Sequence, residues 1–357
     1  MKKDIKKNRF KDKFDFWATN SEEGGWNISS TDEGSQKMLE KENEKQIKIQ
    51  TGTDVIDDFV IDEDTSDDER MIVNMGPQHP STHGVLRLQA ELEGEVVRRV
   101  KPIIGYLHTG MEKTGEELNY FQGPTNTTRM DYLSPLFNEL VFSLTTEKLI
   151  GIEVPDRAKN IRILMTELNR VSSHLVALAT GGMDIGALSM MIFGFREREL
   201  ILNFFEKTTG LRMNHNYIRP GGVAADLPDG WQKDVEEILK IIPEKLQDYD
   251  DMLLDNPIWK GRLQNVGILT TEECFAYGVT GPSLRASGYS WDLRKSQPYS
   301  GIENFDFKVP VLNEGDVFAR WRIKVLEIFE SLAIVEQALN NMPKGPYKIQ
   351  DKKITPP

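Results

Sequence analysis

The feature that most constrains the fold is a long amphipathic segment from about Pro155 to Gly181-Gly182. Apolar side chains recur along it at intervals of three and four residues, the spacing of one face of a helix. These side chains are Ile161, Leu164, Met165, Leu168, Val171, Leu175 and Leu178. The glycine pair offers a stop signal. The segment therefore predicts one long helix that is buried along one face.

Similar patterns predict four further helices. One begins at Ser134-Pro135, where serine suits the N-cap and proline suits the first turn. The others cover about 187–208, part of 231–255, and about 315–341. Turn-rich loops, namely RPGGV, YGVTGPSLRASG and SQPYSG, lie between them. Five helices predict a predominantly helical body.

The chain before these helices has a different period. MIVNM at 71–75 reads as a short strand, and LRLQAEL at 86–92 alternates apolar with polar residues, which is typical of a half-buried strand. Glu93-Gly94-Glu95 then supplies a turn before VVRRV returns at 96–100. We therefore predict a mainly α protein with a small N-terminal antiparallel β-sheet (α+β). Residues 71–105 form the β subdomain and 106–357 the helical bundle domain.

Residues 1–70 are strongly acidic toward their end. DVIDDFVIDEDTSDDE at 54–69 places nine Asp or Glu residues in sixteen positions. We interpret 1–70 as a disordered extension, because it has little apolar surface to offset the entropy of ordering. An electrostatic docking tail is the alternative. The net charge of −12 argues against nucleic acid as a partner.

Two further observations limit the class of protein. The single cysteine, Cys274, rules out an internal disulfide and a thiolate cluster. The amino terminus lacks the apolar core of a signal peptide, and the most apolar segment, GALSMMIFGF at 186–195, is shorter than the ~20 residues of a membrane span. Membrane contact is therefore expected through partners or at the surface.

The loop GPQHPSTHG at 76–84 holds two of the five histidines. It joins two predicted strands, is stiffened by prolines, and has a glycine at each end. His79 and His83 have a spacing that on a helix would suit a metal, but Pro80 argues against a helix. Hydrogen bonding of these histidines to nearby backbone is the alternative.

Other polar residues are candidates for chemistry. Tyr132 precedes a predicted helix start, where free amide groups favour developing negative charge. Asp184 lies in the apolar stretch MDIGALSM, where an isolated buried charge would need a partner such as a histidine. Glu167, Arg170 and His174 are spaced so that Arg170 can pair with either neighbour, which we interpret as an ion network on a helix surface.

These features together resemble one family. The motifs, in order, are GPQHPSTHGVLRL, GYLHTGMEK, TNTTRMDYLSPLFNEL, ELNRVSSHL, GGMDIGAL, NYIRPGGV, GVTGPSLRASG and PYSGIENFDF. From about Met71 to the end, the chain closely resembles the D-subunit family of the proton-pumping NADH:quinone oxidoreductase, respiratory complex I. The resemblance implies a helical bundle like that of the nickel-iron hydrogenase large subunit.

The resemblance also implies partners and a location. Quinone would be the substrate, while NAD and the iron-sulfur clusters would be carried by other complex I subunits and no cofactor by this chain alone. Those partners would include a cluster-bearing subunit of the B type, a subunit of the C type and a membrane-arm subunit of the H type. The protein would then be peripheral on the cytoplasmic face of a bacterial inner membrane.

Single residues carry over by their motifs. His83 resembles the histidine that meets the quinone headgroup, Tyr132 its tyrosine partner, and Asp184 the carboxylate that pairs with the histidine. His79 and Arg129 match further positions near the quinone pocket. The first metal-binding CxxC pair of the hydrogenases would align with Asp, Tyr, Leu and Ser at 131–134, so no metal is expected.

The chain departs from the family pattern in three places. Pro257 stands where an arginine is expected, and Leu263 where a threonine is usual. The sequence ends at KITPP, before a further segment of the family, so we expect a C-terminal truncation. A non-catalytic scaffold or inactive fragment is therefore one alternative. A metalloenzyme that uses His79, His83, His108 and Asp184 is another.

Overall fold

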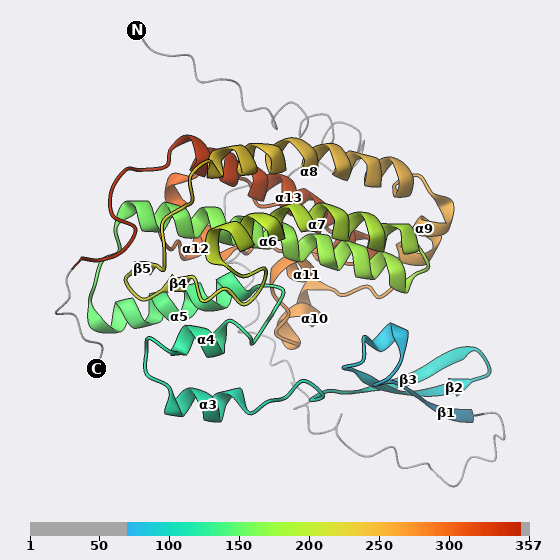
Figure 1. Cartoon of the computed structure of the whole chain (residues 1–357). Helices are drawn as coiled ribbons and strands as arrows, with labels where there is room; N and C mark the ends of the chain where they lie inside the picture. The colour runs from blue at the N-terminus through green and yellow to red at the C-terminus, as the bar shows by residue number, and fades with distance from the viewer. Residues whose placement is uncertain (1–69, 351–357) are drawn as a thin grey trace, which may run out of the picture. The chain divides into compact units, whose positions relative to one another are not determined.

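The computed structural model describes residues 70–350, which fall into two compact units (Figure 1). One unit holds residues 70–111 and the other holds residues 112–350. The division lies between Met111 and Glu112, later than the 105/106 boundary expected from the sequence. Each unit is described by itself. The expected disordered extension lies outside the described residues, except for Arg70.

The smaller unit contains the antiparallel sheet that the alternating pattern predicts. Its strands are β1 (Arg70–Met75), β2 (Arg87–Glu93) and β3 (Val96–Ile103), in the spatial order β1-β2-β3. The central strand β2 pairs with both neighbours, and its Ala90 is buried. The sheet therefore confirms the three expected strands, with the histidine-bearing loop between β1 and β2.

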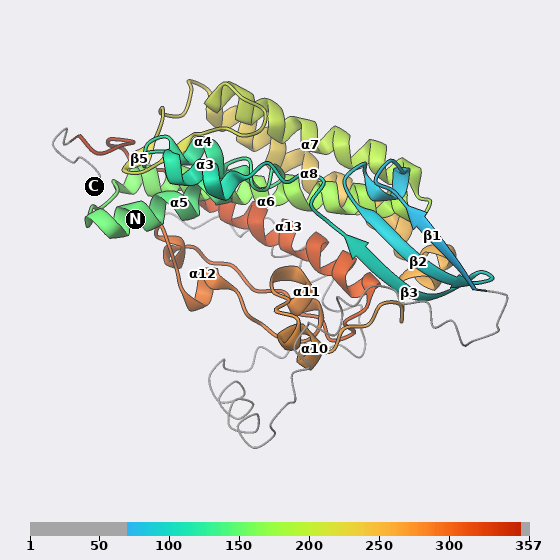
Figure 2. The same ribbon diagram turned by 90° about the horizontal axis from the view of Figure 1, so that it is seen from below.

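Five long helices make up most of the larger unit, as the helical periodicity predicts (Figures 1 and 2). They are α5 (Pro135–Ile150), α6 (Asp156–Asp184), α7 (Leu188–Thr209), α8 (Trp231–Leu253) and α13 (Val317–Asn340). Helix α6 packs against α5, α7 and α13, while α8 packs against α7 and α13. The mainly α architecture with a small antiparallel sheet is thereby confirmed.

Helix α6 is the centre of this bundle. Its side chains Ile161, Leu164 and Leu168 are completely buried, as their spacing predicts. The expected stop at the glycine pair is wrong, because the helix continues to Asp184. A Cβ on Gly182 would lie 2.7 Å from the Cβ of Met190 on α7. Gly182 therefore permits close packing of two helices and does not end one.

Shorter helices lie before α5 or between the long helices, and one 3-10 turn lies between β1 and β2. They are α3 (Met111–Glu117), α4 (Gly123–Thr127), α9 (Pro257–Leu263), α10 (Thr271–Ala276), α11 (Gly281–Ala286), α12 (Leu293–Ser296) and two 3-10 turns, η1 (Pro80–Thr82) and η2 (Ile302–Asn304). The segment expected as the loop YGVTGPSLRASG thus contains α11. Within residues 70–350, no helix is both long enough and apolar enough to cross a membrane.

Pro257 and Leu263, the two residues expected to depart from the family pattern, fit their local structure. Pro257 is the first residue of α9, where proline's missing N–H costs nothing. Asn256 caps that helix by accepting hydrogen bonds from the backbone amides of residues 258 and 259. Leu263, the last residue of α9, is buried in the main core. Both departures from the family pattern are therefore accommodated by the packing of α9.

The expected loop RPGGV forms a small hairpin of β4 (Ile218–Arg219) and β5 (Gly222–Val223). The chain near residue 348 joins it, since the Val223 amide donates to the Tyr347 carbonyl at 3.1 Å. A Cβ on Gly222 would lie 2.4 Å from the same carbonyl oxygen. Only glycine allows this approach, so the hairpin is held on one side by the carboxy-terminal segment.

We predict that the free energy of unfolding depends on pH through His215, which lies just before this hairpin. Its ring is buried against Phe205, and Nδ1 lies 3.0 Å from the Leu211 carbonyl, to which it donates. Burial lowers the pKa of His215 from 6.5 to about 4, although the carbonyl opposes the shift. The unfolded chain therefore takes up the proton first as the pH falls. We expect the free energy of unfolding to decrease by up to ~3 kcal/mol between about pH 7 and pH 4.

Urea unfolding of the purified chain at several pH values measures this dependence. His215→Phe keeps the aromatic packing and should flatten the pH dependence relative to the unchanged chain. His108→Gln, in an exposed loop, should keep it. Equal slopes for the unchanged chain and His215→Phe would contradict the assignment.

Candidate functional site

The loop between β1 and β2 is organised by His79. Its backbone is extended, and its Nδ1 atom accepts a hydrogen bond of 3.2 Å from the Ser81 amide. The Ser81 hydroxyl lies 2.7 Å from the same nitrogen. His79 thus caps the 3-10 turn η1, so the alternative of local backbone hydrogen bonding is confirmed for this histidine.

A buried threonine braces the same loop. The Thr82 hydroxyl lies 3.0 Å from the carbonyl oxygens of both Pro77 and His79. At the start of the loop, a Cβ on Gly76 would lie 2.2 Å from the Leu86 carbonyl, so glycine is required there. His83 closes η1 in the left-handed region, with φ 53°, and is exposed. The loop therefore presents His83 from a braced backbone.

Tyr132 lies in the larger unit, on a turn between α4 and α5. The Asp131 carboxylate accepts from the Leu133 amide at 3.0 Å, and its carbonyl accepts from the Ser134 amide at 3.1 Å. The Tyr132 side chain is 47% exposed. Arg129 precedes it on the same segment and donates through Nη1 to the Thr125 carbonyl. Arg129 and Tyr132 are therefore brought together on one exposed turn.

Two buried side chains hold this turn at its ends. Asn169 of α6 donates from Nδ2 to the Leu133 carbonyl at 2.9 Å. At the other end, the Thr128 hydroxyl donates to Glu139 of α5 at 2.7 Å. Neither Asn169 nor Glu139 was predicted from the sequence, because each side chain contacts residues that lie outside its own helix. We define the Tyr132 turn as residues 128–134.

Glu139 also fixes the segment NYIRPGGV. Its carboxylate accepts from the backbone amides of Asn216, Tyr217 and Ile218 at 2.6, 2.8 and 2.9 Å. Burial raises the pKa of Glu139, and the four hydrogen bonds that it accepts oppose this shift. Because every partner is a donor, the arrangement suits the carboxylate. One buried group thereby connects the Tyr132 turn to the approach to β4.

Asp184 is the last residue of α6 and is exposed. The expectation that its carboxylate is buried in an apolar stretch is therefore wrong. The apolar neighbours of Asp184 in sequence do not bury it, because the connection between α6 and α7 is exposed there. Leu188 at the start of α7 is 61% exposed. The helix dipole destabilises a carboxylate at a helix C-terminus, and a cationic or hydrogen-bonding partner stabilises it.

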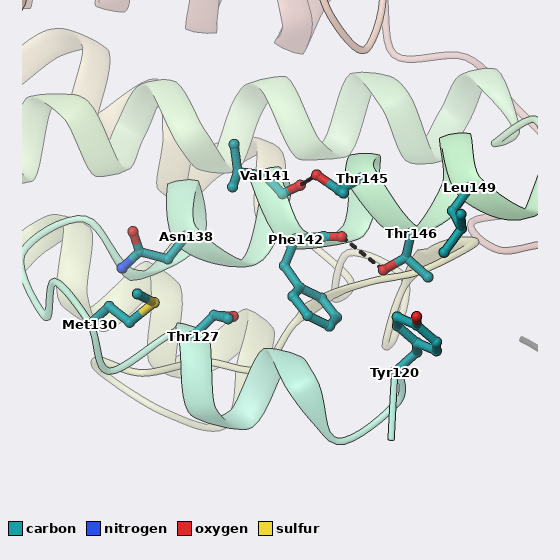
Figure 3. A pocket seen from close by; sticks show the side chains of 9 residues that line it. All are labelled: Tyr120, Thr127, Met130, Asn138, Val141, Phe142, Thr145, Thr146 and Leu149. Atoms are coloured by element: carbon teal, nitrogen blue, oxygen red, sulfur yellow. Dashed lines mark hydrogen bonds between the residues drawn. The ribbon is translucent and has the colours of Figure 1, made fainter. Parts of the chain in front are cut away.

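A cavity of about 350 Å³ lies between α4 and α5 (Figure 3). Its lining is mostly apolar and includes Tyr120, Met130, Val141, Phe142 and Leu149. Thr145 and Thr146 point their hydroxyls back to carbonyls of α5, at 2.8 and 3.0 Å, so these groups are already satisfied. The cavity therefore offers apolar surface beside the Tyr132 turn.

The chain is similar over most of its length to subunits of NADH-quinone oxidoreductases. It is 56% identical over 296 residues to a D subunit of the NADH-quinone oxidoreductase of Salinispora arenicola, which is 82% of this chain and 67% of the relative. It is 53% identical over 314 residues to the D subunit of the same enzyme from Mycobacteroides abscessus, which is 87% of this chain and 73% of the relative. The family profile "Respiratory-chain NADH dehydrogenase, 49 Kd subunit" matches residues 184–357.

The chain belongs to the D-subunit family of NADH-quinone oxidoreductases. Its membership confirms the resemblance that the ordered motifs indicate. The structure brings together some, but not all, of the residues that the family motifs select. His79 and His83 share one loop in the smaller unit, and Arg129 and Tyr132 share one turn in the larger unit. Asp184 is on neither, so the catalytic set His83, Tyr132 and Asp184 stays a prediction.

The metal alternative gains no support from the described part of the chain. Within residues 70–350, no group of three or more His, Cys, Asp or Glu side chains is placed to hold a metal ion. Cys274 is a free, buried thiol.

The ion network expected on the surface of α6 is instead buried in the helical bundle. Glu167 is almost fully buried and accepts from Arg170 at 3.1 Å and from Arg294 of α12 at 3.1 Å. Arg294 also bonds to Asp292 at 2.6 Å. Burial would raise the pKa of Asp292, but the hydrogen bonds from Arg294 and the positive charge of Arg294 hold that pKa well below its usual range. The expectation of a surface network is therefore wrong, while the Arg170 to Glu167 pair is confirmed.

His174 belongs to a second part of the network. Its Nε2 lies 2.7 Å from Glu327 of α13, and Arg285 of α11 bonds the other oxygen of Glu327 at 2.6 Å. Burial would raise the pKa of Glu327, but the hydrogen bond from His174 and the positive charges lower it to about 2. Helix spacing could not reveal these pairs, because Glu327 and Arg285 lie on helices far along the sequence from His174.

Proposed function

We propose that this chain is the quinone-site subunit of an NADH-quinone oxidoreductase of the complex I type. It would form, together with a cluster-bearing partner subunit, the chamber in which quinone is reduced and protonated during electron transfer from NADH. The observation that carries the proposal is the identity above 50% to subunits named for this activity, over more than four fifths of the chain.

The chemistry of the named side chains supports this assignment. Two-electron reduction of a quinone develops negative charge on two carbonyl oxygens, and each oxygen takes up a proton to give the quinol. A phenol at Tyr132 and an imidazolium at His83 would each donate a hydrogen bond and then a proton to one oxygen. A carboxylate at Asp184 would favour the protonated imidazole of His83.

The local geometry supports the same roles. His83 is exposed at the end of the braced loop, and Tyr132 is half exposed on a turn tied to two buried side chains. Groups that donate to a reacting oxygen must be accessible and also fixed in position. Arg129, three residues before Tyr132, would place a positive charge near the developing oxyanion.

The proposed activity requires partners. NAD and the iron-sulfur clusters that deliver electrons would be bound by other subunits, with a B-type, a C-type and an H-type subunit as neighbours. Proton translocation would depend on the membrane arm. The chain would then be peripheral at the cytoplasmic face of a bacterial inner membrane and contact the membrane through those partners.

Asp184→Asn tests the proposed proton donor. In the assembled complex, we expect slower NADH:quinone turnover and an alkaline limb that moves to lower pH, because His83 loses the negative charge that favours its protonated form. The rate with a soluble quinone analogue is measured between about pH 5.5 and 9. Transfer from NADH to an artificial acceptor upstream of quinone reports intact assembly.

Asp156→Asn is the matched control, because Asp156 is the exposed aspartate at the opposite end of the same helix. It should leave both the rate and the pH profile unchanged. An Asp184→Asn profile identical to that of the unchanged complex would remove the link between Asp184 and His83.

A further inference from the structure

Helix α5, which follows the Tyr132 turn, starts without a cap of its own. Ser134 occupies the N-cap position and Pro135 the first helical position, as the sequence predicts. The Ser134 side chain, however, makes no capping hydrogen bond. The first amides of a helix need an acceptor from outside the helix, so another group must supply it.

Asn169 of α6 supplies that acceptor. Its Oδ1 accepts from the Leu136 amide, the second residue of α5, at 3.1 Å. Its Nδ2 donates to the Leu133 carbonyl at 2.9 Å. Asn169 is only 2% exposed, so both bonds are shielded from water. A single amide thus bonds the backbone on both sides of Ser134.

The two bonds constrain the position of Tyr132. The peptide that Nδ2 holds begins at Leu133, the residue directly after Tyr132. The amide that Oδ1 holds is in the first turn of α5, so the exit of the turn is tied to the helix start. The amide group carries its donor nitrogen and its acceptor oxygen on one short planar side chain, and glutamine is longer by one methylene. The pair of contacts therefore fits asparagine at this position.

We propose that Asn169 is a positioning residue for Tyr132, acting as a cap from a neighbouring helix that fixes where the phenol stands. This inference rests on the proposed function, because it assigns Asn169 a role in quinone reduction through Tyr132. A displacement of about 1 Å of a reacting group costs on the order of 10²-fold in rate. Loss of the tether should therefore lower turnover without removing any group that touches quinone.

The test is a double-mutant cycle in the assembled complex. Asn169→Ala should lower kcat for NADH:quinone turnover by about 10- to 100-fold and leave electron transfer to an upstream artificial acceptor unchanged. In a Tyr132→Phe background, the same change should lower kcat by less than about 3-fold, because the group that it positions is already gone. A full 10- to 100-fold further loss in that background would overturn the inference.

Two controls separate positioning from general damage. Asn160→Ala makes the same substitution on α6, at a residue whose Oδ1 accepts no hydrogen bond among the described residues. Ser134→Ala removes the hydroxyl that occupies the N-cap position without capping. Both should keep turnover within about 2-fold of the unchanged complex. A loss with Ser134→Ala equal to that with Asn169→Ala would overturn the inference.

Asn169→Asp covers the case in which Asn169→Ala does not assemble. It keeps an oxygen for the Leu136 amide but places a second oxygen against the Leu133 carbonyl, so it should show the same dependence on Tyr132. If Tyr132→Phe alone leaves turnover normal, the proposed function fails. If Tyr132→Phe slows turnover and neither Asn169 variant does, only the positioning role fails.

Discussion

Replacement of Tyr132 by phenylalanine is expected to slow quinone reduction by about 10²- to 10⁴-fold, the usual contribution of a positioned general acid. The change removes only the hydroxyl that would donate to the quinone oxygen. Tyr132 is 47% exposed, so the loss of its hydroxyl should cost the bundle little stability. The complex should therefore assemble and pass electrons to an upstream acceptor at the normal rate.

Tyr120→Phe is the matched control for this substitution. Tyr120 lies in the same unit, where its ring lines the cavity between α4 and α5. Turnover with a quinone analogue and transfer to the upstream acceptor are measured for both variants. Normal quinone turnover in an assembled Tyr132→Phe complex would contradict the catalytic role. Equal losses in the two variants would point to general damage.

The helices were predictable because their signal is local. The spacing of Leu164, Leu168 and Leu175 marks the buried face of α6 without any knowledge of what covers it. The end of that helix was less accessible to sequence reasoning. Gly182 has the residue type of a stop signal, and only the contact with Met190 of α7 explains why the helix passes through it.

Burial of polar residues was harder to predict than secondary structure. Asp184 has apolar neighbours in sequence and is exposed, whereas Glu167, which lies between Thr166 and Leu168, is almost fully buried. The burial of Glu167 depends on Arg294, which reaches it from α12, 127 residues later. A single sequence holds no signal for such a pair, because each partner alone resembles an ordinary surface charge.

The residues of the candidate site also differ in how well the sequence predicts them. Local patterns marked His83, Tyr132 and Asp184 as candidates, and only the motif resemblance assigned them roles at a quinone. The groups that hold Tyr132 in place were not found, since Asn169 acts through backbone atoms of another element. His79 could be interpreted from its loop alone, because its partner Ser81 is two residues away.

The second large effect concerns Arg162, which is completely buried near the start of α6, where it contacts the β4-β5 hairpin. Its Nη atoms bond both oxygens of Glu147 at 3.0 and 2.5 Å. Nη2 also donates to the Gly222 carbonyl of β5 at 2.9 Å, and Glu147 accepts from the Gly221 amide at 2.7 Å. The ion pair therefore holds the hairpin against α5 and α6.

Arg162→Met is expected to lower the free energy of unfolding by about 3–5 kcal/mol, because it leaves the Glu147 charge buried without its partner. Urea unfolding of the purified chain measures the change. Arg212→Met is the control, since Arg212 makes the same two-bond contact with Glu199 at 2.8 and 2.6 Å but on the surface, with side chains 43% and 48% exposed. That variant should lose no more than ~1 kcal/mol.

A second substitution distinguishes a stranded charge from lost packing. Glu147→Gln keeps an oxygen for the Gly221 amide but carries no charge. Added to Arg162→Met, it should recover part of the lost stability, because the double variant buries no unpaired ion. If the double variant is as unstable as Arg162→Met plus the separate cost of Glu147→Gln, the two groups are not coupled. The destabilisation would then come from the carbonyls of the hairpin that Arg162 no longer contacts.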